Sequence, residues 1–187
     1  MSLSSILLGK AAVERRQWQL LDLMHCGISG GILAGISFAV AQAAMSGAQG
    51  RPVLEPLQLA GSLIVEPMGI VPGSISLATI GLFVHFVISS VYGIVFLFLH
   101  WELKRHNEST ERLILDGAIF GLMIWMVHFF WIAPRAYPQF LTLDLVWNGL
   151  VAHAFFFGGV LGYYVANLRF AREEEEEDPG MPEWSRV

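Results

Sequence analysis

The sequence LATIGLFVHFVISSVYGIVFLFL (residues 77–99) is apolar almost throughout and contains one histidine, His85. About 20 apolar residues are enough for a helix to cross a bilayer. A second stretch, LVWNGLVAHAFFFGGVLGYYVANL (residues 145–168), has the same character, and in both a Gly-Leu pair is followed three residues later by a histidine, His85 or His153. An ionisable side chain within hydrocarbon is costly and usually faces the interior of a bundle. These stretches therefore predict a membrane bundle arranged around the two histidines.

The composition of the whole chain indicates the same class of protein. Of the 187 residues, 55% are hydrophobic and 14% charged, and the mean hydropathy is +0.56. A soluble domain needs a more polar surface than this composition provides. No basic stripe is present, so nucleic-acid binding is not expected. The single cysteine, Cys26, excludes an internal disulfide and a cysteine-based metal site.

The hydropathy pattern predicts an all-α fold, an integral membrane four-helix bundle with spans at residues 21–45, 77–99, 113–133 and 144–168. Pro134 is expected to end the third span. The loop at residues 46–76 is long and rich in proline and glycine. Its apolar middle, residues 57–65, is too short to cross the bilayer, and is expected either to lie at the outer interface or to dip inward as a short helix packed on protein.

The two ends of the chain are polar. In residues 1–20 the apolar side chains recur at helical spacing, which predicts an amphipathic interfacial helix; a frayed terminus that only carries orienting charges is the alternative. The tail, residues 169–187, holds a run of acidic residues at 173–178 and is expected to be disordered and solvated.

Lysine and arginine are unevenly distributed around the predicted spans. Cytoplasmic loops of membrane proteins carry an excess of these residues. Both termini are therefore predicted to be cytoplasmic, in a bacterial inner membrane. One side carries Lys10, Arg15, Arg16, Lys104, Arg105, Arg112, Arg169 and Arg172, and the other carries Arg51 and Arg135.

Small residues recur every fourth position in two of the spans. The first span has Gly27, Gly31 and Gly35 on one face, and the third has Gly117 and Gly121. Such faces let helix backbones approach closely in a membrane. The first face is expected to meet either another helix of the chain or a partner subunit. Similar spacings in the first and third spans, together with the shared Gly-Leu-x-x-His element, indicate two repeated helical hairpins.

The histidines permit two chemical interpretations. His85 and His153 are candidate axial ligands of a b-type haem, since imidazoles from facing helices commonly hold such a cofactor. Alternatively, His85, His128 and His153 form a three-histidine zinc or copper site. The structural alternative is that the histidines only join helices by hydrogen bonds to Ser89, Ser90, Thr79 or Asn148. The sequence has no spaced carboxylate pair, no Ser-His-Asp order and no phosphate-binding glycine loop, so catalysis is not expected.

The second to fourth spans carry a family resemblance. The segment from His85 to Ser89 (HFVIS), the pair Val127-His128, the pair Ala133-Pro134, Pro138-x-Phe140 and His153 are similar to small bacterial inner-membrane proteins of the YagU-like kind. The resemblance implies a four-span inner-membrane protein and brings no settled reaction with it.

Together these features predict a non-catalytic accessory subunit of a larger bacterial membrane complex, of respiratory or photosynthetic electron transfer. The glycine face, the aromatic run at residues 155–157 and the polar ends suit assembly with other membrane subunits and with lipid. One alternative is a membrane cytochrome that holds haem through His85 and His153. Another is an independent small inner-membrane protein of envelope or stress function.

Overall fold

The computed structural model describes residues 3–65, 75–102 and 109–177, and every regular element in these ranges is helical. Four helical runs are long and apolar enough to cross a membrane: Leu20–Ala48, Ile75–His100, Thr110–Ala136 and Leu145–Leu168. These bounds lie within a few residues of the predicted spans. The prediction of an all-α membrane bundle is confirmed.

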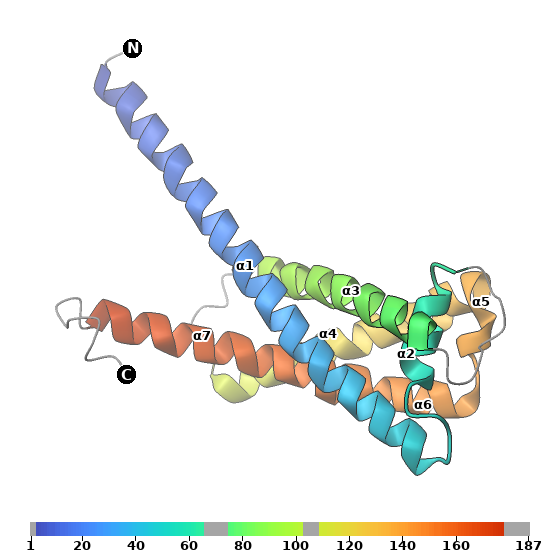
Figure 1. The fold of residues 1–187 in the computed structure, drawn as a ribbon. Helices are drawn as coiled ribbons and strands as arrows, with labels where there is room; N and C mark the ends of the chain where they lie inside the picture. Colours follow the sequence, from blue (N-terminus) through green and yellow to red (C-terminus); the bar gives the residue numbers. More distant parts are fainter. Residues whose placement is uncertain (1–2, 66–74, 103–108, 178–187) are drawn as a thin grey trace.

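The chain forms two helical hairpins (Figure 1). The start of α1 and the end of α7 lie at one end of the bundle, and α2, α5 and α6 lie at the other. The first hairpin contains α1 (Leu3–Ala48), α2 (Glu55–Ser62) and α3 (Ile75–Glu102). The second contains α4 (Thr110–Met126), the π-helix η1 (Val127–Ile132), α5 (Ala133–Ala136), the 3-10 helix η2 (Pro138–Phe140), α6 (Leu143–Val151), the π-helix η3 (Ala152–Gly159) and α7 (Val160–Glu177).

Glycines hold the backbones of α1 and α3 against each other. A Cβ atom added to Gly27 would lie 2.6 Å from the Cα atom of Ile94, and one added to Gly31 would collide with the backbone carbonyl of Ser89. Gly93 of α3 meets the backbone of Gly27 in return. The glycine face of the first span therefore lies against the chain's own helix.

The second hairpin is joined in the same manner. Gly117 and Gly121 of α4 lie against the backbones of Gly158 and His153, and Gly162 of α7 lies against Leu113. Only hydrogen atoms fit between these backbones. The two hairpins then meet through a cluster of buried side chains: Ala34, Phe96, Phe120, Ile124, Phe157 and Leu161.

The long connection between the first two spans contains a helix packed on protein. After α1, Gly50 adopts a left-handed conformation with φ of 73° and redirects the chain toward α2. Gly61 of α2 meets the carbonyl of Leu77, and Gly81 of α3 meets the carbonyl of Leu57. Of the two alternatives for residues 57–65, the packed short helix is therefore found. Residues 66–74 lie outside the described part of the chain.

Both ends of the chain are more helical than expected. The amphipathic segment predicted at residues 1–20 is not a separate helix, because α1 runs without a break from Leu3 to Ala48 and projects beyond its neighbours (Figure 1). The prediction of disorder is wrong for residues 173–177, since α7 continues to Glu177. Extending a formed helix adds one hydrogen bond for each residue fixed, and glutamate is a good helix former. Residues 178–187 of the tail lie outside the described residues.

The third span also continues beyond its predicted end, because Pro134 does not stop it. The chain forms the π-helix η1 before the proline, and the N–H of Ala133 donates to the carbonyl of His128, five residues back. A proline ring clashes with the carbonyl four residues back in a regular α-helix and lacks an N–H. The wider π-turn removes the regular register just before the proline, and helical structure continues to Ala136.

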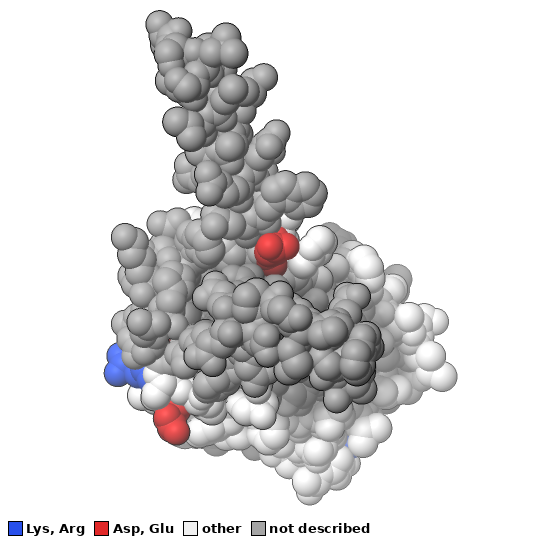
Figure 2. All heavy atoms as spheres, turned by 90° about the vertical axis from the view of Figure 1, so that its left-hand side faces the viewer, with Lys and Arg blue, Asp and Glu red and all other residues white. Residues whose placement is uncertain are grey.

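Apolar side chains dominate the described surface. Phe83, Trp131 and Phe155 are 71%, 67% and 64% exposed. Figure 2 looks onto the end that carries the start of α1, and charged side chains appear there only as isolated groups among the described residues. Exposed aromatic rings at this density suit contact with lipid rather than water.

The glycine contacts predict a difference between two adjacent positions. Gly158→Ala places a Cβ against the backbone of Gly117 and 3.1 Å from the Cα atom of Ala118, so it should lower the free energy of unfolding by about 1–3 kcal/mol. Gly159→Ala is the matched control, since its nearest atom is the Ala154 oxygen at 3.8 Å. Thermal unfolding in detergent, followed by circular dichroism, measures both. Equal losses in the two variants would contradict a role in close packing.

Candidate functional site

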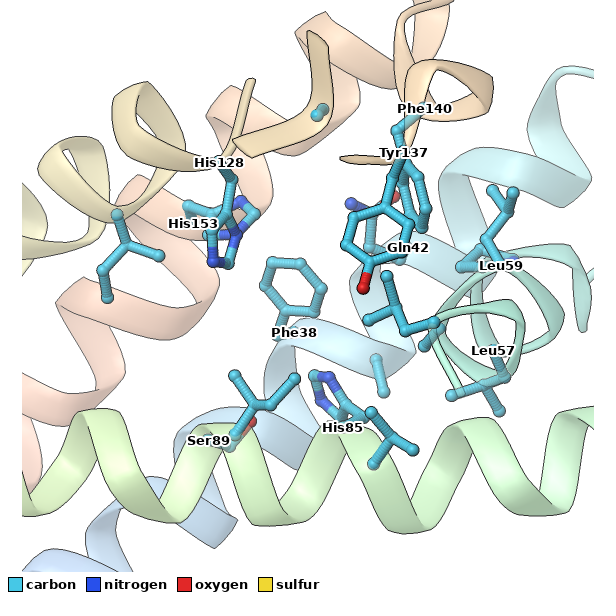
Figure 3. Close-up of a pocket in the computed structure, with 18 of the residues that line it drawn as sticks. Phe38, Gln42, Leu57, Leu59, His85, Ser89, His128, Tyr137, Phe140 and His153 are labelled. Atoms are coloured by element: carbon cyan, nitrogen blue, oxygen red, sulfur yellow. The ribbon is translucent and has the colours of Figure 1, made fainter. Parts of the chain in front are cut away.

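A cavity of about 520 Å³ lies between α1 and α3 on one side and the η1 and η3 segments on the other (Figure 3). His85, His128 and His153 all line it. The remaining wall is mainly apolar and includes Leu59, Ile88, Ile124, Phe129 and Phe157. The structure thus brings the three histidines singled out in the sequence to one cavity, with a contribution from each hairpin.

His85 is fixed by the glycine face of α1. Its Nε2 atom lies 2.8 Å from the backbone carbonyl oxygen of Gly35. A carbonyl only accepts hydrogen bonds, so Nε2 carries the hydrogen. The approach depends on the absence of a side chain at Gly35, where a Cβ would lie 2.7 Å from Ser89 Oγ and 3.4 Å from His85 Nε2. One glycine therefore serves both helix packing and placement of the imidazole.

His153 is held by its own helix. Its Nδ1 atom lies 2.7 Å from the backbone carbonyl oxygen of Gly149, one turn earlier, and the residue is buried. By the same reasoning Nδ1 carries the hydrogen and donates it to that carbonyl. In an uncharged ring the remaining nitrogen, Nε2, is then a hydrogen-bond acceptor.

His128 pairs with a residue from the other hairpin. The Tyr92 hydroxyl lies 2.7 Å from His128 Nε2, which joins α3 to η1. The rings of His128 and His153 are neighbours, with centroids 5.5 Å apart and planes at 83°. Tyr92, His128 and His153 thus form a polar cluster to which both hairpins contribute, in a cavity with mainly apolar walls.

Both histidines of this cluster lie in π-helical segments, His128 in η1 and His153 in η3. π-Helical turns are rare and occur frequently at functional sites. A π-turn shifts the residues that follow it around the helix axis relative to a regular helix. The two segments therefore change which side chains each helix presents to the cavity.

The described side chains do not fit the predicted haem site. In Figure 3 the ring of Phe38 lies between His85 and His153. Its centroid is 5.3 Å from that of His85, in a stacked arrangement, and 4.7 Å from that of His153, edge to face. A haem held by these two imidazoles would have to occupy the position of Phe38, and His85 Nε2 is already bonded to a carbonyl.

The three-histidine metal site is not formed either. Among the described residues, no group of three or more His, Cys, Asp or Glu side chains lies close enough to hold a metal ion. Each histidine instead has a hydrogen-bond partner of another kind. Three of the four polar side chains named as alternatives bond elsewhere: Thr79 to Ile75, Ser90 to Phe86, and Asn148 to Gln49.

One end of the cavity is covered by α2 and by the segment that contains Tyr137 and Phe140 (Figure 3). Two amide side chains fasten this end. Gln49 Nε2 donates to Asn148 Oδ1, and Asn148 Nδ2 donates to Gln49 Oε1, each at 3.1 Å. This reciprocal pair ties the end of α1 to α6, and therefore ties one hairpin to the other.

Sequence reasoning missed Tyr92, Phe38 and Gln42, all of which line the cavity. A signal for Tyr92 exists, because His85 and Tyr92 are seven residues apart and share a helix face. Phe38 follows Gly35 by three residues, which also places it on the glycine face. Neither spacing reveals which helix lies opposite.

Comparison with known proteins adds no relative. No protein-family model, no curated protein and no solved structure matches the chain. The resemblance to YagU-like proteins remains a prediction, and the cavity is interpreted from its own geometry.

The Tyr92–His128 contact predicts a measurable contribution to stability. Tyr92→Phe removes the hydroxyl and keeps the ring, so it should lower the free energy of unfolding by about 0.5–2 kcal/mol, the usual value of an interhelical hydrogen bond in a membrane. Tyr163→Phe is the control, because Tyr163 is 56% exposed. Thermal unfolding in detergent compares the two. A Tyr92→Phe variant as stable as the control would show that this bond joins the hairpins only weakly.

Proposed function

We propose that this chain is a non-catalytic, multi-pass membrane protein that holds a small hydrophobic molecule inside its bundle. The observation that carries the proposal is the cavity of about 520 Å³. Ligand pockets are typically about 300–1,000 Å³, mostly apolar, with a few placed polar groups. This cavity has that volume and that pattern of lining residues.

The shape of the cavity supports a bound molecule. It is partly open at the surface of the bundle, so a hydrophobic molecule can enter it. Within each hairpin the helices approach each other to backbone contact, through Gly31 in one hairpin and Gly117 in the other. Bulky side chains such as Phe38 and Phe129 line the space without filling it.

The lining residues support binding rather than catalysis. Among the described residues that line the cavity, the polar side chains are three histidines, two tyrosines, one glutamine and one serine, with no carboxylate or lysine. General acid–base chemistry on a bound molecule usually needs a base oriented by a charged partner. The histidines here are oriented by backbone carbonyls and by a tyrosine.

A second role, as a subunit of a larger bacterial membrane complex, is favoured by the shape of α1. The N-terminal part of this helix extends beyond the other helices (Figure 1). A projecting helix at the end where α1 begins and α7 ends offers a surface for a neighbouring subunit, and the basic residues around it favour a cytoplasmic position in an inner membrane. A hydrophobic molecule held in the membrane suits a respiratory or photosynthetic complex.

Filling the cavity should displace its ligand. Ala39 lines the cavity and Ala44 of the same helix is exposed, so Ala39→Phe and Ala44→Phe make the same change inside and outside the site. Protein purified from membranes in mild detergent is extracted with organic solvent, and the extract is analysed by mass spectrometry. We expect a compound present in stoichiometric amount in wild type and in Ala44→Phe, and lost in Ala39→Phe. Identical extracts from all three proteins would contradict the proposal.

Removing the projecting part of α1 tests the second role. A variant lacking residues 3–16 should lose stoichiometric partner subunits during purification from the native membrane, while its thermal unfolding in detergent stays unchanged. The physical reason is that this part of α1 lies beyond the neighbouring helices. Native gel electrophoresis with quantitative mass spectrometry provides the measurement. A wild-type protein that migrates without partners would exclude the subunit role.

A further inference from the structure

We propose that the ligand is a hydroxyl-bearing hydrophobic molecule, a long-chain alcohol or alkylphenol, whose hydroxyl binds between His153 and the Tyr92–His128 pair. The inference rests on the proposed function and specifies the chemical class of the ligand. It follows from counting the hydrogen-bond donors and acceptors that the polar cluster leaves unused.

His153 contributes an acceptor. Its Nδ1–H is committed to the carbonyl of Gly149 at 2.7 Å. An uncharged imidazole has one N–H and one lone pair, so Nε2 accepts. His153 lines the cavity, and its ring has the rings of Phe38 and His128 as neighbours, with centroids 4.7 Å and 5.5 Å away. A ligand that satisfies this nitrogen must donate a proton.

The Tyr92–His128 pair contributes a donor, whichever way its own bond is arranged. If the Tyr92 hydroxyl donates to His128 Nε2, the hydrogen of the uncharged ring is on Nδ1 and stays available. If His128 Nε2–H donates to the tyrosine oxygen, the tyrosine O–H stays available. In either arrangement, the Tyr92–His128 pair has one O–H or N–H hydrogen that is not used in the 2.7 Å bond joining the two residues, and this hydrogen can be donated to a ligand.

A hydroxyl group matches this combination. It has one proton to donate to His153 and lone pairs to accept from the pair. The His128 and His153 rings are neighbours, with centroids 5.5 Å apart and planes nearly perpendicular. A single hydroxyl beside the two rings, on the cavity side, is therefore close to both groups.

Other head groups match less well. A ketone, ester or ether has no proton for His153 Nε2. A carboxylate or ammonium would bring a charge into a cavity with mainly apolar walls, which is costly in a membrane. A pure hydrocarbon would leave both polar groups of the cluster unpaired.

The rest of the cavity accommodates a hydrocarbon chain. From the histidine cluster the space continues past Phe38 toward Leu57, Leu59 and Phe140, which lie on the α2 side (Figure 3). His85 is on α3, across the cavity from His128 and His153, and its Nε2–H is already donated to Gly35. The head group is therefore assigned to the His128–His153 wall, and the chain to the α2 end.

A matched pair of probes tests the assignment. 4-Nonylphenol and 4-nonylanisole differ only in that a methyl group replaces the hydroxyl proton. Binding of each tritiated compound to the detergent-solubilised full chain is measured by scintillation proximity, with Ala39→Phe as the background. Wild type should bind the phenol about tenfold more tightly than the ether, the ratio that one hydrogen bond provides.

Variants locate the recognition. His153→Leu should bring the phenol-to-ether ratio close to one, and His25→Leu, the same change at an exposed position, should leave it unchanged. Tyr92→Phe, which keeps the ring, should lower the ratio and provides a second variant if His153→Leu fails to fold.

The outcomes separate the inference from the proposed function. Equal binding of both probes to wild type, lost in Ala39→Phe, would overturn hydroxyl recognition and leave ligand binding intact. A tenfold ratio that His153→Leu and Tyr92→Phe both preserve would overturn the assigned position. Binding of neither probe would overturn the inference, and the extracts of wild type and Ala39→Phe would then decide the proposed function separately.

Discussion

Backbone-to-backbone contact through glycine is the constraint on which the rest of this structure depends. Lipid surrounds the bundle, so no hydrophobic force brings one apolar helix to another. Each hairpin gains its contact from backbones that approach until a single Cβ would not fit, at Gly31 against Ser89 and at Gly117 against Gly158. Dispersion between closely spaced atoms then stabilises the contact.

The same close approach makes backbone carbonyls available to side chains. Gly35 presents its carbonyl to His85 because no side chain screens it, and His153 finds the carbonyl of Gly149 within its own helix. The hydrogen bond to a carbonyl fixes the tautomer of each imidazole without a charged partner. This explains how a membrane bundle contains buried histidines without carboxylates beside them, and why the cavity provides an acceptor at a known atom.

Departures from regular helix gather near the cavity. The π-helices η1 and η3 contain His128 and His153, and η1 also allows the chain to pass Pro134. A regular α-helix would end or kink at the proline. The π-helix η1 therefore has two consequences. It lets the third span continue past the proline, and it lies where the polar cluster forms.

Length and hydrophobicity by themselves determined the number of spans, their approximate bounds, and the placement of His85 and His153 within helices. These properties are local, and about 20 apolar residues suffice to define a span. Where a helix ends depends on whether each turn is extended by the next one. That continuation produced three features: the unbroken α1, the helical residues 173–177 and the helix that passes Pro134. The Tyr92–His128 bond and the position of Phe38 between two imidazoles depend on the rotation and register of three helices. Only packing sets that rotation, because the apolar side chains around a span are equally compatible with lipid until a neighbouring helix covers one of its faces.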